Sequence, residues 1–320
     1  WRDAPKEEVI ACGRRWSAVY AEETLRMPRQ NARMRFLFSR VRDSLDRLLS
    51  DLCDEFSACL FEPLDFELQF SAHDALGSVE IPLPGGGAAV LSGKVDRVDG
   101  FLYNGTLYVR VVDYKSAARA FRFADIAAGI GLQLLLYLFV LEERAARYRT
   151  LHPELPAGTP LAPAGVLYAP IGTPVVTLPV PPEEDPEGAD AAAAKKNART
   201  GLFTDNTDVL RAMDPDGRGA RIPVRFTNGG APRSDAPVAT PAQFAALRRH
   251  VEAMLAQMGQ SLASGENDAC PSEDAAGRMV CETCPYHAVC RFDADSEPVH
   301  RLLSVNRTEF FASLAAEDNP

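Results

Sequence analysis

Hydrophobic spacing changes along the chain and predicts helices at the start, followed by a mixed α/β region. Residues 5–60 contain apolar positions three or four apart, most clearly in RFLFSRVRDSLDRLLSDLCDEF, with arginine and aspartate between them. This period is typical of an amphipathic helix. From residue 61 the period shortens towards two, in FELQF and more weakly in SVEIPL, which indicates strands.

An Asn-Gly pair predicts a tight hairpin in the middle of this region. Asn104-Gly105 favours a two-residue turn, because both residues tolerate positive φ. We therefore expect residues 90–101 and 106–115 to pair as antiparallel strands. A helix is expected at about 123–148, and AGVLYAPI then predicts an apolar strand.

The second half of the chain combines an irregular segment with a well-marked helix. Residues 172–236 are rich in proline, acid and glycine, which favours an extended, partly mobile insertion with a short helix near TDVLRAM and a strand near RIPVRF. Thr240, Pro241 and Gln243 are typical of a capped helix start. The apolar face of that helix would comprise Phe244, Leu247, Val251, Met254, Leu255, Met258 and Leu262.

Charged residues gather at one end of the predicted hairpin. Asp113 and Lys115 are two apart on a strand and share a face, with Tyr114 on the other face. Asp96, on the partner strand, should lie level with Asp113. Two close carboxylates repel each other unless a cation lies between them, and Mg²⁺ prefers such oxygen ligands. Two aspartates and a lysine are a minimal set for metal-assisted phosphodiester hydrolysis.

A surface ion pair is the alternative interpretation of Asp113 and Lys115. The following helix favours a site instead, because Gln133 and Tyr137 share a face among leucines. If buried, these two side chains need hydrogen-bond partners such as a phosphate or the lysine. The basic residues that are candidates to contact a DNA backbone are Arg97, Arg110, Arg119 and Arg122.

Composition restricts the class of protein. The 320 residues have a formal net charge of −10, which argues against autonomous, tight nucleic-acid binding by bulk attraction. No apolar run reaches the roughly 18–20 residues that span a bilayer, so no membrane association is expected. Seven cysteines are too few for a disulfide scaffold and favour a reducing cytoplasm. The chain begins at Trp1 without a leader pattern, so we expect a fragment of a longer protein.

Three cysteines form a compact cluster near the C-terminus. Cys281, Cys284 and Cys290 have the spacing C-x₂-C-x₅-C, and thiolates at this density bind zinc or an iron–sulfur cluster. On zinc, His287 would be the fourth ligand. Three unligated thiols in a turn remain the other possibility.

Taken together, the motifs GKVDRVD, VVDYKS and GLQLLLY resemble the RecB-like branch of the PD-(D/E)XK nuclease superfamily. GLFTDNTDVLRAMDPDG, IPVRF, PAQFAALRRHVEAML and CETCPYHAVCRFD are similar to the C-terminal nuclease region of AddB-type subunits of bacterial ATP-dependent helicase–nucleases. The resemblance extends over nearly the whole chain.

The resemblance implies roles for the residues singled out above. Asp96, Asp113 and the backbone carbonyl of Tyr114 would bind Mg²⁺, Lys115 would be the catalytic lysine, and Gln133 and Tyr137 would complete the site. Cys281, Cys284 and Cys290 would hold a [4Fe–4S] cluster whose fourth cysteine lies outside this chain. The resemblance also implies a histidine ligand on a helix upstream of the first strand. We expect this histidine to precede Trp1, since His73 follows the FELQF strand and Glu67 is the nearest substitute.

We therefore expect one α/β nuclease domain over residues 1–320, with a mixed central sheet flanked by helices and a C-terminal cysteine-cluster clasp. Its expected segments are N-terminal helices (1–60), a catalytic core (61–171), the insertion (172–236), a helix with the iron–sulfur clasp (237–293) and a tail (294–320). The expected function is Mg²⁺-dependent, exonuclease-type hydrolysis of single-stranded DNA at DNA ends, with an AddA-like helicase–nuclease partner, in double-strand-break repair. The alternative is a non-catalytic DNA-end-binding scaffold stabilised by iron–sulfur or zinc.

Overall fold

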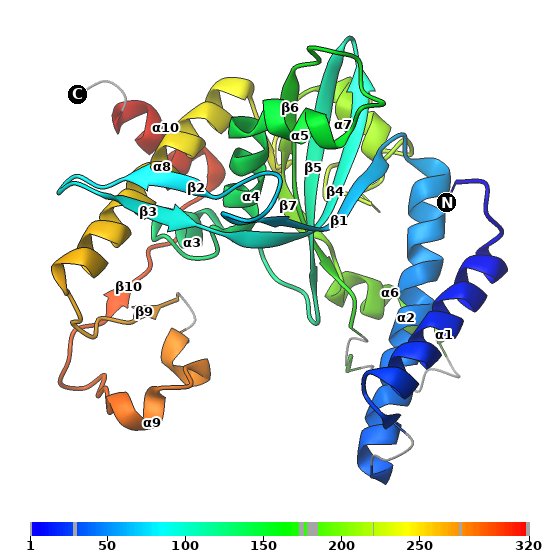
Figure 1. Ribbon diagram of the computed structural model, residues 1–320, viewed down its shortest axis with the longest axis horizontal. Coiled ribbons are helices and arrows are strands. Elements are labelled where there is room, and N and C mark those ends of the chain that lie inside the picture. The colour runs from blue at the N-terminus through cyan, green and yellow to red at the C-terminus, as the bar shows by residue number, and fades with distance from the viewer. Residues whose placement is uncertain are drawn as a thin grey trace. The chain divides into compact units, whose positions relative to one another are not determined.

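Two structural units, each assembled from three chain segments, make up the described part of the protein (Figure 1). The computed structural model describes residues 2–27, 31–172, 176–177, 185–219, 221–274 and 277–317. The first unit comprises Trp1–Leu68, Val95–Ala120 and Gly158–Val238, and the second comprises Gln69–Lys94, Phe121–Ala157 and Ala239–Pro320. The expected segments within a single domain stay a prediction.

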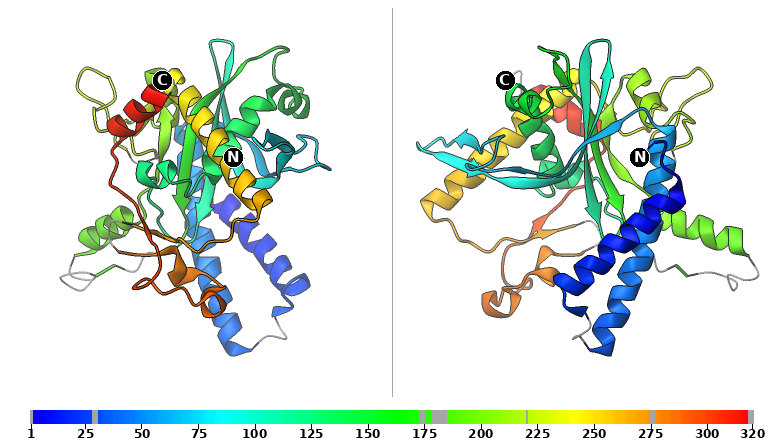
Figure 2. Two further views of the ribbon diagram at one scale, coloured as in Figure 1. Left: turned by 90° about the vertical axis from the view of Figure 1, so that its left-hand side faces the viewer. Right: turned by 45° about the vertical axis from the view of Figure 1, so that its right-hand side comes forward.

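A helical hairpin opens the first unit, as the apolar spacing predicted. Helices α1 (Lys6–Glu23) and α2 (Ala32–Ala58) lie side by side in both views of Figure 2. Asn31 begins α2 because its side chain accepts a hydrogen bond from the Met34 amide. The last turns of α2 bury Leu52 and Phe56 in the core of the unit.

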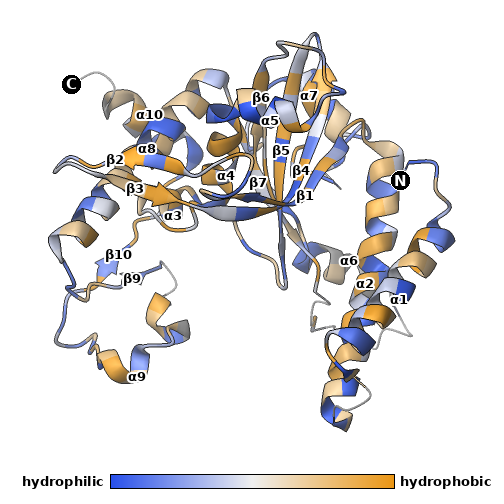
Figure 3. Ribbon diagram, in the orientation of Figure 1, coloured by the Kyte–Doolittle hydropathy of each residue, from blue (hydrophilic) through white to orange (hydrophobic). Residues whose placement is uncertain are grey.

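The central sheet is mixed, which confirms the expected α/β fold. Its strands are β1 (Glu62–Phe70), β4 (Gly93–Tyr103), β5 (Thr106–Lys115), β6 (Leu161–Pro170), β7 (Thr200–Thr204) and β8 (Val238–Ala239), in the order β1-β4-β5-β6-β7-β8. Strand β5 pairs antiparallel with β4 and parallel with β6, and β7 returns antiparallel to β6. Hydrophobic residues run along β5 (Figure 3), as expected of a strand buried on both faces.

Glycine placement explains one confirmed and one wrong prediction. The β4–β5 hairpin turns at Asn104 and Gly105, whose φ angles are 49° and 76°, as the Asn-Gly pair predicted. The single helix expected at 123–148 is wrong, because the chain forms α3 (Phe123–Ala127), α4 (Gln133–Glu143) and α5 (Ala145–Leu151). Gly129 and Gly131 separate α3 from α4 with φ angles of 75° and 70°, which no continuous helix allows.

The segment expected to be an insertion contributes to the core of the first unit. Its described residues form α6 (Pro186–Lys196), strand β7 and α7 (Thr207–Met213), and the helix near TDVLRAM is therefore confirmed. Leu202 and Phe203 on β7 are fully buried. The strand expected near RIPVRF is wrong, since residues 221–226 contribute only to isolated bridges, at Arg225 and Phe226.

Helix α8 (Pro241–Ser264) organises the second unit. Thr240 and Gln243 form the predicted capping box at its start. The helix packs against α4, α10 (Arg307–Glu317) and the hairpin of β2 (Val79–Pro82) and β3 (Ala88–Leu91). Leu262, expected on its apolar face, is 78% exposed, so that part of the prediction is wrong.

Short elements complete the second unit. They are β9 (Ser272–Glu273), η2 (Val280–Thr283), α9 (His287–Cys290) and β10 (His300–Arg301), and β9 and β10 pair in parallel. Across the described ranges, none of the helices has both the length and the apolar character needed to cross a membrane.

Candidate active site

The ends of β4 and β5 bring two carboxylates and an ammonium together. The antiparallel register pairs Arg97 with Val112, so Asp96 comes opposite Asp113 one position further along. The Asp96 Oδ2 atom accepts a 2.8 Å hydrogen bond from the Tyr114 amide. The Lys115 Nζ atom lies 2.6 Å from Asp113 Oδ2. The three groups therefore share one face and one end of the hairpin.

Burial makes the charge on Asp113 costly. Its side chain is almost completely buried, whereas that of Lys115 is 27% exposed. Burial raises the pKa of Asp113, the ammonium of Lys115 opposes this rise, and the nearby Asp96 carboxylate adds to it. A cation placed between the two carboxylates would lower the free energy of their ionised forms.

The donor set at this position fits a hard divalent cation. Two carboxylates beside a strand-end carbonyl are oxygen ligands of the kind that Mg²⁺ binds while keeping several waters. In the part of the chain that the structure describes, no three or more His, Cys, Asp or Glu side chains are grouped to hold a metal ion. An ion here would therefore depend on Asp96, Asp113, the Tyr114 carbonyl and water or substrate oxygens.

The opposite face of the same hairpin carries a buried ion network. Glu55 on α2 lies 3.0 Å from Arg97, 2.7 Å from Arg110 and 2.7 Å from Arg199. Asp99 lies 2.9 Å from Arg97 and 2.6 Å from Arg110. Except for Arg199, these side chains are at most 2% exposed. Arg97 and Arg110 as DNA contacts are therefore a wrong prediction, because α2 covers the face on which they lie.

Tyr114 connects this network to the candidate site. Arg97 donates a 2.7 Å hydrogen bond to the Tyr114 hydroxyl, and Tyr114 stands between Asp113 and Lys115 in the chain. The hydrogen bond therefore restrains the strand end from the opposite face. The sequence contains a signal for this network that was missed: Arg97, Asp99 and Arg110 occupy one strand face, and paired charges on an otherwise apolar sheet indicate internal ion pairs.

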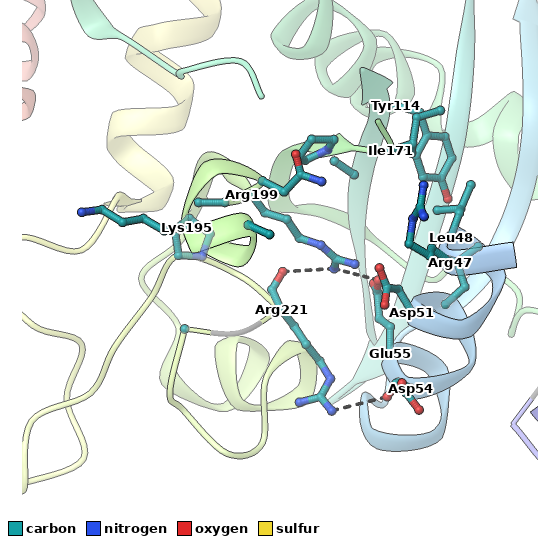
Figure 4. Close-up of a pocket in the computed structure, with 18 of the residues that line it drawn as sticks. Arg47, Leu48, Asp51, Asp54, Glu55, Tyr114, Ile171, Lys195, Arg199 and Arg221 are labelled. Carbon is teal, nitrogen blue, oxygen red and sulfur yellow. Dashed lines mark hydrogen bonds and ion pairs between the residues drawn. The ribbon is translucent and has the colours of Figure 1, made fainter. Parts of the chain in front are cut away.

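A cavity of about 1160 Å³ opens on this network side of the sheet (Figure 4). Tyr114 and Arg97 line it from the sheet, and Glu55 lines it from α2. Arg199 reaches Glu55 and the Arg221 carbonyl across it. The carboxylates of Asp96 and Asp113 are not among its lining residues, so the cavity is separate from the candidate active site.

Gln133 and Tyr137 lie at the start of α4, in the second unit. The Gln133 Nε2 atom donates a 2.9 Å hydrogen bond to the Tyr137 hydroxyl. Tyr137 is buried and packs edge-on against Phe70. Gln133 is exposed, so of the two side chains only that of Tyr137 is a buried polar group that needs a partner, and Gln133 supplies it. Their part in the active site stays a prediction.

The C-terminal cysteines are not gathered into a metal site among the described residues. Cys281 is half-buried, Cys284 and Cys290 are exposed, and all three are free thiols. His287 is exposed. The structure thus gives no support to an iron–sulfur cluster or to zinc at this position, and both ligand sets stay predictions. Glu67, the expected substitute for the family histidine, is exposed in β1 with a φ angle of 56°.

Comparison with known proteins identifies the family. The chain matches the PD-(D/E)XK nuclease superfamily over residues 2–291, and it belongs to that superfamily. This confirms the resemblance noted from the strand and helix motifs.

Similar curated proteins are described as a subunit of an ATP-dependent helicase/deoxyribonuclease. The protein of Symbiobacterium thermophilum is 36% identical over 288 residues, which cover 88% of this chain and 24% of that protein. The protein of Heliobacterium modesticaldum is 32% identical over 304 residues, covering 92% of this chain and 25% of its own length. The protein of Pelotomaculum thermopropionicum is 33% identical over 266 residues, which cover 82% of this chain and 22% of that protein. The chain spans about a quarter of the length of these relatives.

Proposed function

We propose that this chain is a Mg²⁺-dependent nuclease domain that hydrolyses phosphodiester bonds of single-stranded DNA. One observation carries the proposal: Asp96, Asp113 and Lys115 converge at the end of the β4–β5 hairpin in a member of a nuclease superfamily. Carboxylates and an ammonium in this arrangement are the groups that metal-assisted phosphodiester hydrolysis requires.

Each group has a separate task in the proposed mechanism. Asp96, Asp113 and the Tyr114 carbonyl would hold Mg²⁺, which supplies an activated water and neutralises charge on the phosphate when bound. Lys115 stabilises the negative charge that develops on the phosphate oxygens, since its ammonium is partly exposed and lies at the same strand end as the two carboxylates. The Arg97–Tyr114 hydrogen bond keeps the strand end in position for both.

The substrate and partner are proposed from the relatives and from the charge. The relatives are described as helicase/deoxyribonuclease subunits, and we extend this to an AddA-like helicase partner that delivers DNA ends during double-strand-break repair. Delivery by a partner also fits a net charge of −10, which gives little bulk attraction for DNA. The seven free cysteines are consistent with a reducing cytoplasm.

The test is digestion of single-stranded DNA with and without Mg²⁺, comparing the parent with Asp113→Asn and Lys115→Ala. We expect both variants to lose at least about 100-fold in rate. Asp113→Asn removes a proposed Mg²⁺ ligand, and Lys115→Ala removes the ammonium that stabilises the charge on the phosphate. Asp208→Asn is the control, because Asp208 is an exposed acid bonded to Tyr103 at the turn end of β4. Equal digestion by the parent and Asp113→Asn would contradict the proposal, and DNA-end binding without any cleavage would favour the scaffold.

A further inference from the structure

Tyr168 lies directly beside the candidate active site. It is the β6 partner of Asp113 in the parallel register, and it is only 3% exposed. Two cations approach its ring: Lys115 Nζ lies 5.8 Å and Arg119 Cζ lies 5.2 Å from the ring centroid. Both distances are within the range of cation–π attraction. The ammonium of Lys115 and the guanidinium of Arg119 therefore both lie next to the ring of Tyr168.

The backbone of Arg119 is held while its side chain stays accessible. The Arg119 carbonyl accepts a hydrogen bond from the Thr200 hydroxyl, which ties the loop after β5 to β7. The side chain is exposed, and within the described ranges no carboxylate lies at ion-pair distance from it. Arg97 and Arg110, in contrast, are buried and form ion pairs with Glu55 and Asp99.

Lys115 and Arg119 both place a positive charge next to the ring of Tyr168. Two cations next to one ring repel each other, and an anion between them removes that repulsion. The exposed side chain of Arg119 can therefore bind the same phosphate group whose charge Lys115 is proposed to stabilise.

We propose that Arg119 is a phosphate-binding residue of this active site, presented on the ring of Tyr168 to the DNA backbone beside Asp113 and Lys115. The inference rests on the proposed nuclease function and adds a substrate contact to it. A guanidinium offers a planar fork to two phosphate oxygens. The aromatic support limits its freedom before DNA binds, so less side-chain entropy is lost on binding.

Two measurements on the purified full chain test this role. The first is kcat/KM for a single-stranded oligonucleotide with Mg²⁺. The second is the dissociation constant of the same oligonucleotide at several NaCl concentrations, in an Asp113→Asn background without Mg²⁺. The variants are Arg119→Ala, Arg119→Lys and Tyr168→Leu. Arg233→Ala is the matched control, because Arg233 is an exposed arginine of the same unit, 3.2 Å from Asp235.

We expect Arg119→Ala to lose roughly 100-fold in kcat/KM and to reduce the salt slope by about 0.7, the value for one phosphate contact on a single strand. Arg119→Lys should keep the salt slope but recover only part of kcat/KM, because an ammonium lacks the fork. Tyr168→Leu should behave like Arg119→Ala if it remains folded by circular dichroism. Arg233→Ala should match the parent.

The two readouts separate failure of this inference from failure of the proposed function. If the parent cleaves DNA and Arg119→Ala equals Arg233→Ala in rate and salt slope, the role of Arg119 is refuted while the nuclease stands. If the parent does not cleave, the nuclease proposal fails, and the salt slope alone decides whether Arg119 contacts a phosphate. An equal loss of slope in Arg233→Ala would assign the effect to net charge and also overturn the inference.

Discussion

Replacing Glu55 by glutamine tests whether the buried ion network supports the sheet beneath the active site. Glu55 is 2% exposed and contacts Arg97, Arg110 and Arg199 at 2.7–3.0 Å. Without its charge, Asp99 is the one buried carboxylate among the described residues that still pairs with Arg97 and Arg110. Removing one partner of a buried ion pair costs about 3–5 kcal/mol. We expect about 3 kcal/mol, because the amide keeps one acceptor oxygen.

The pH dependence of this loss follows from the pKa of Glu55. Burial alone would raise that pKa, but Arg199, Arg110 and Arg97 together lower it well below the ordinary value. A carboxyl whose pKa is lowered on folding stabilises the protein above its unfolded pKa of about 4.3, and the contribution is lost as the pH falls through the folded pKa. The difference between parent and variant should therefore be constant from pH 8 to pH 5 and shrink below about pH 4.

Urea unfolding followed by circular dichroism measures the effect. Glu62→Gln is the control, because Glu62 is 72% exposed and 3.5 Å from Arg2, and exposed pairs contribute at most about 1 kcal/mol. The midpoint should shift clearly for Glu55→Gln and little for Glu62→Gln, at unchanged slope. A loss below about 1 kcal/mol for Glu55→Gln would refute the argument that this network stabilises the unit.

Three further predictions concern other parts of the chain. Burial raises the pKa of Glu142 to about 7 against the opposing charge of Arg248. The folded state therefore keeps the proton of Glu142 to a higher pH than the unfolded state does, and the free energy of unfolding falls as the pH rises from about 4 to 7. Relative to the parent, Glu142→Gln should raise the free energy of unfolding by about 1–2 kcal/mol at pH 8, a value discounted for partial exposure, and leave it unchanged at pH 4. Equal increases at both pH values would contradict this. Gly105→Ala should lower the free energy of unfolding by about 1 kcal/mol in a thermal unfolding experiment, because the φ of 76° is unfavourable for alanine. A steric clash does not contribute, since an added Cβ would meet no atom within 4 Å. An unchanged unfolding midpoint would refute the prediction. Tyr114→Phe removes the acceptor of Arg97 and should cost about 1.5–3 kcal/mol in urea unfolding, together with part of the cleavage rate. Full stability and activity would show that the hydrogen bond does not position the strand end.

Elements specified by neighbouring residues were predictable. The turn at Asn104-Gly105 and the capping box of Thr240 and Gln243 depend on contacts within a few residues, so their motifs predicted them correctly. The same local rules could have separated α3 from α4, since Gly129 and Gly131 break the helix. Strand β7 was missed because it is specified by its non-local pairing with β6, in a segment whose composition indicates a loop.

Period-two alternation and the hairpin turn were enough to bring Asp96, Asp113 and Lys115 to one end of one face, because register follows from the turn and a strand has only two faces. The sequence could not show which face is solvent-accessible, since both carry charge. Tertiary structure decided this: α2 brings Glu55 over the face of Arg97 and Arg110 and buries them. Tyr168, distant in sequence, pairs with Asp113 across the sheet and lies next to Arg119. The free-energy cost of burying an arginine is offset where a carboxylate from another element forms an ion pair with it. Such a contact between elements distant in sequence forms only when the chain folds.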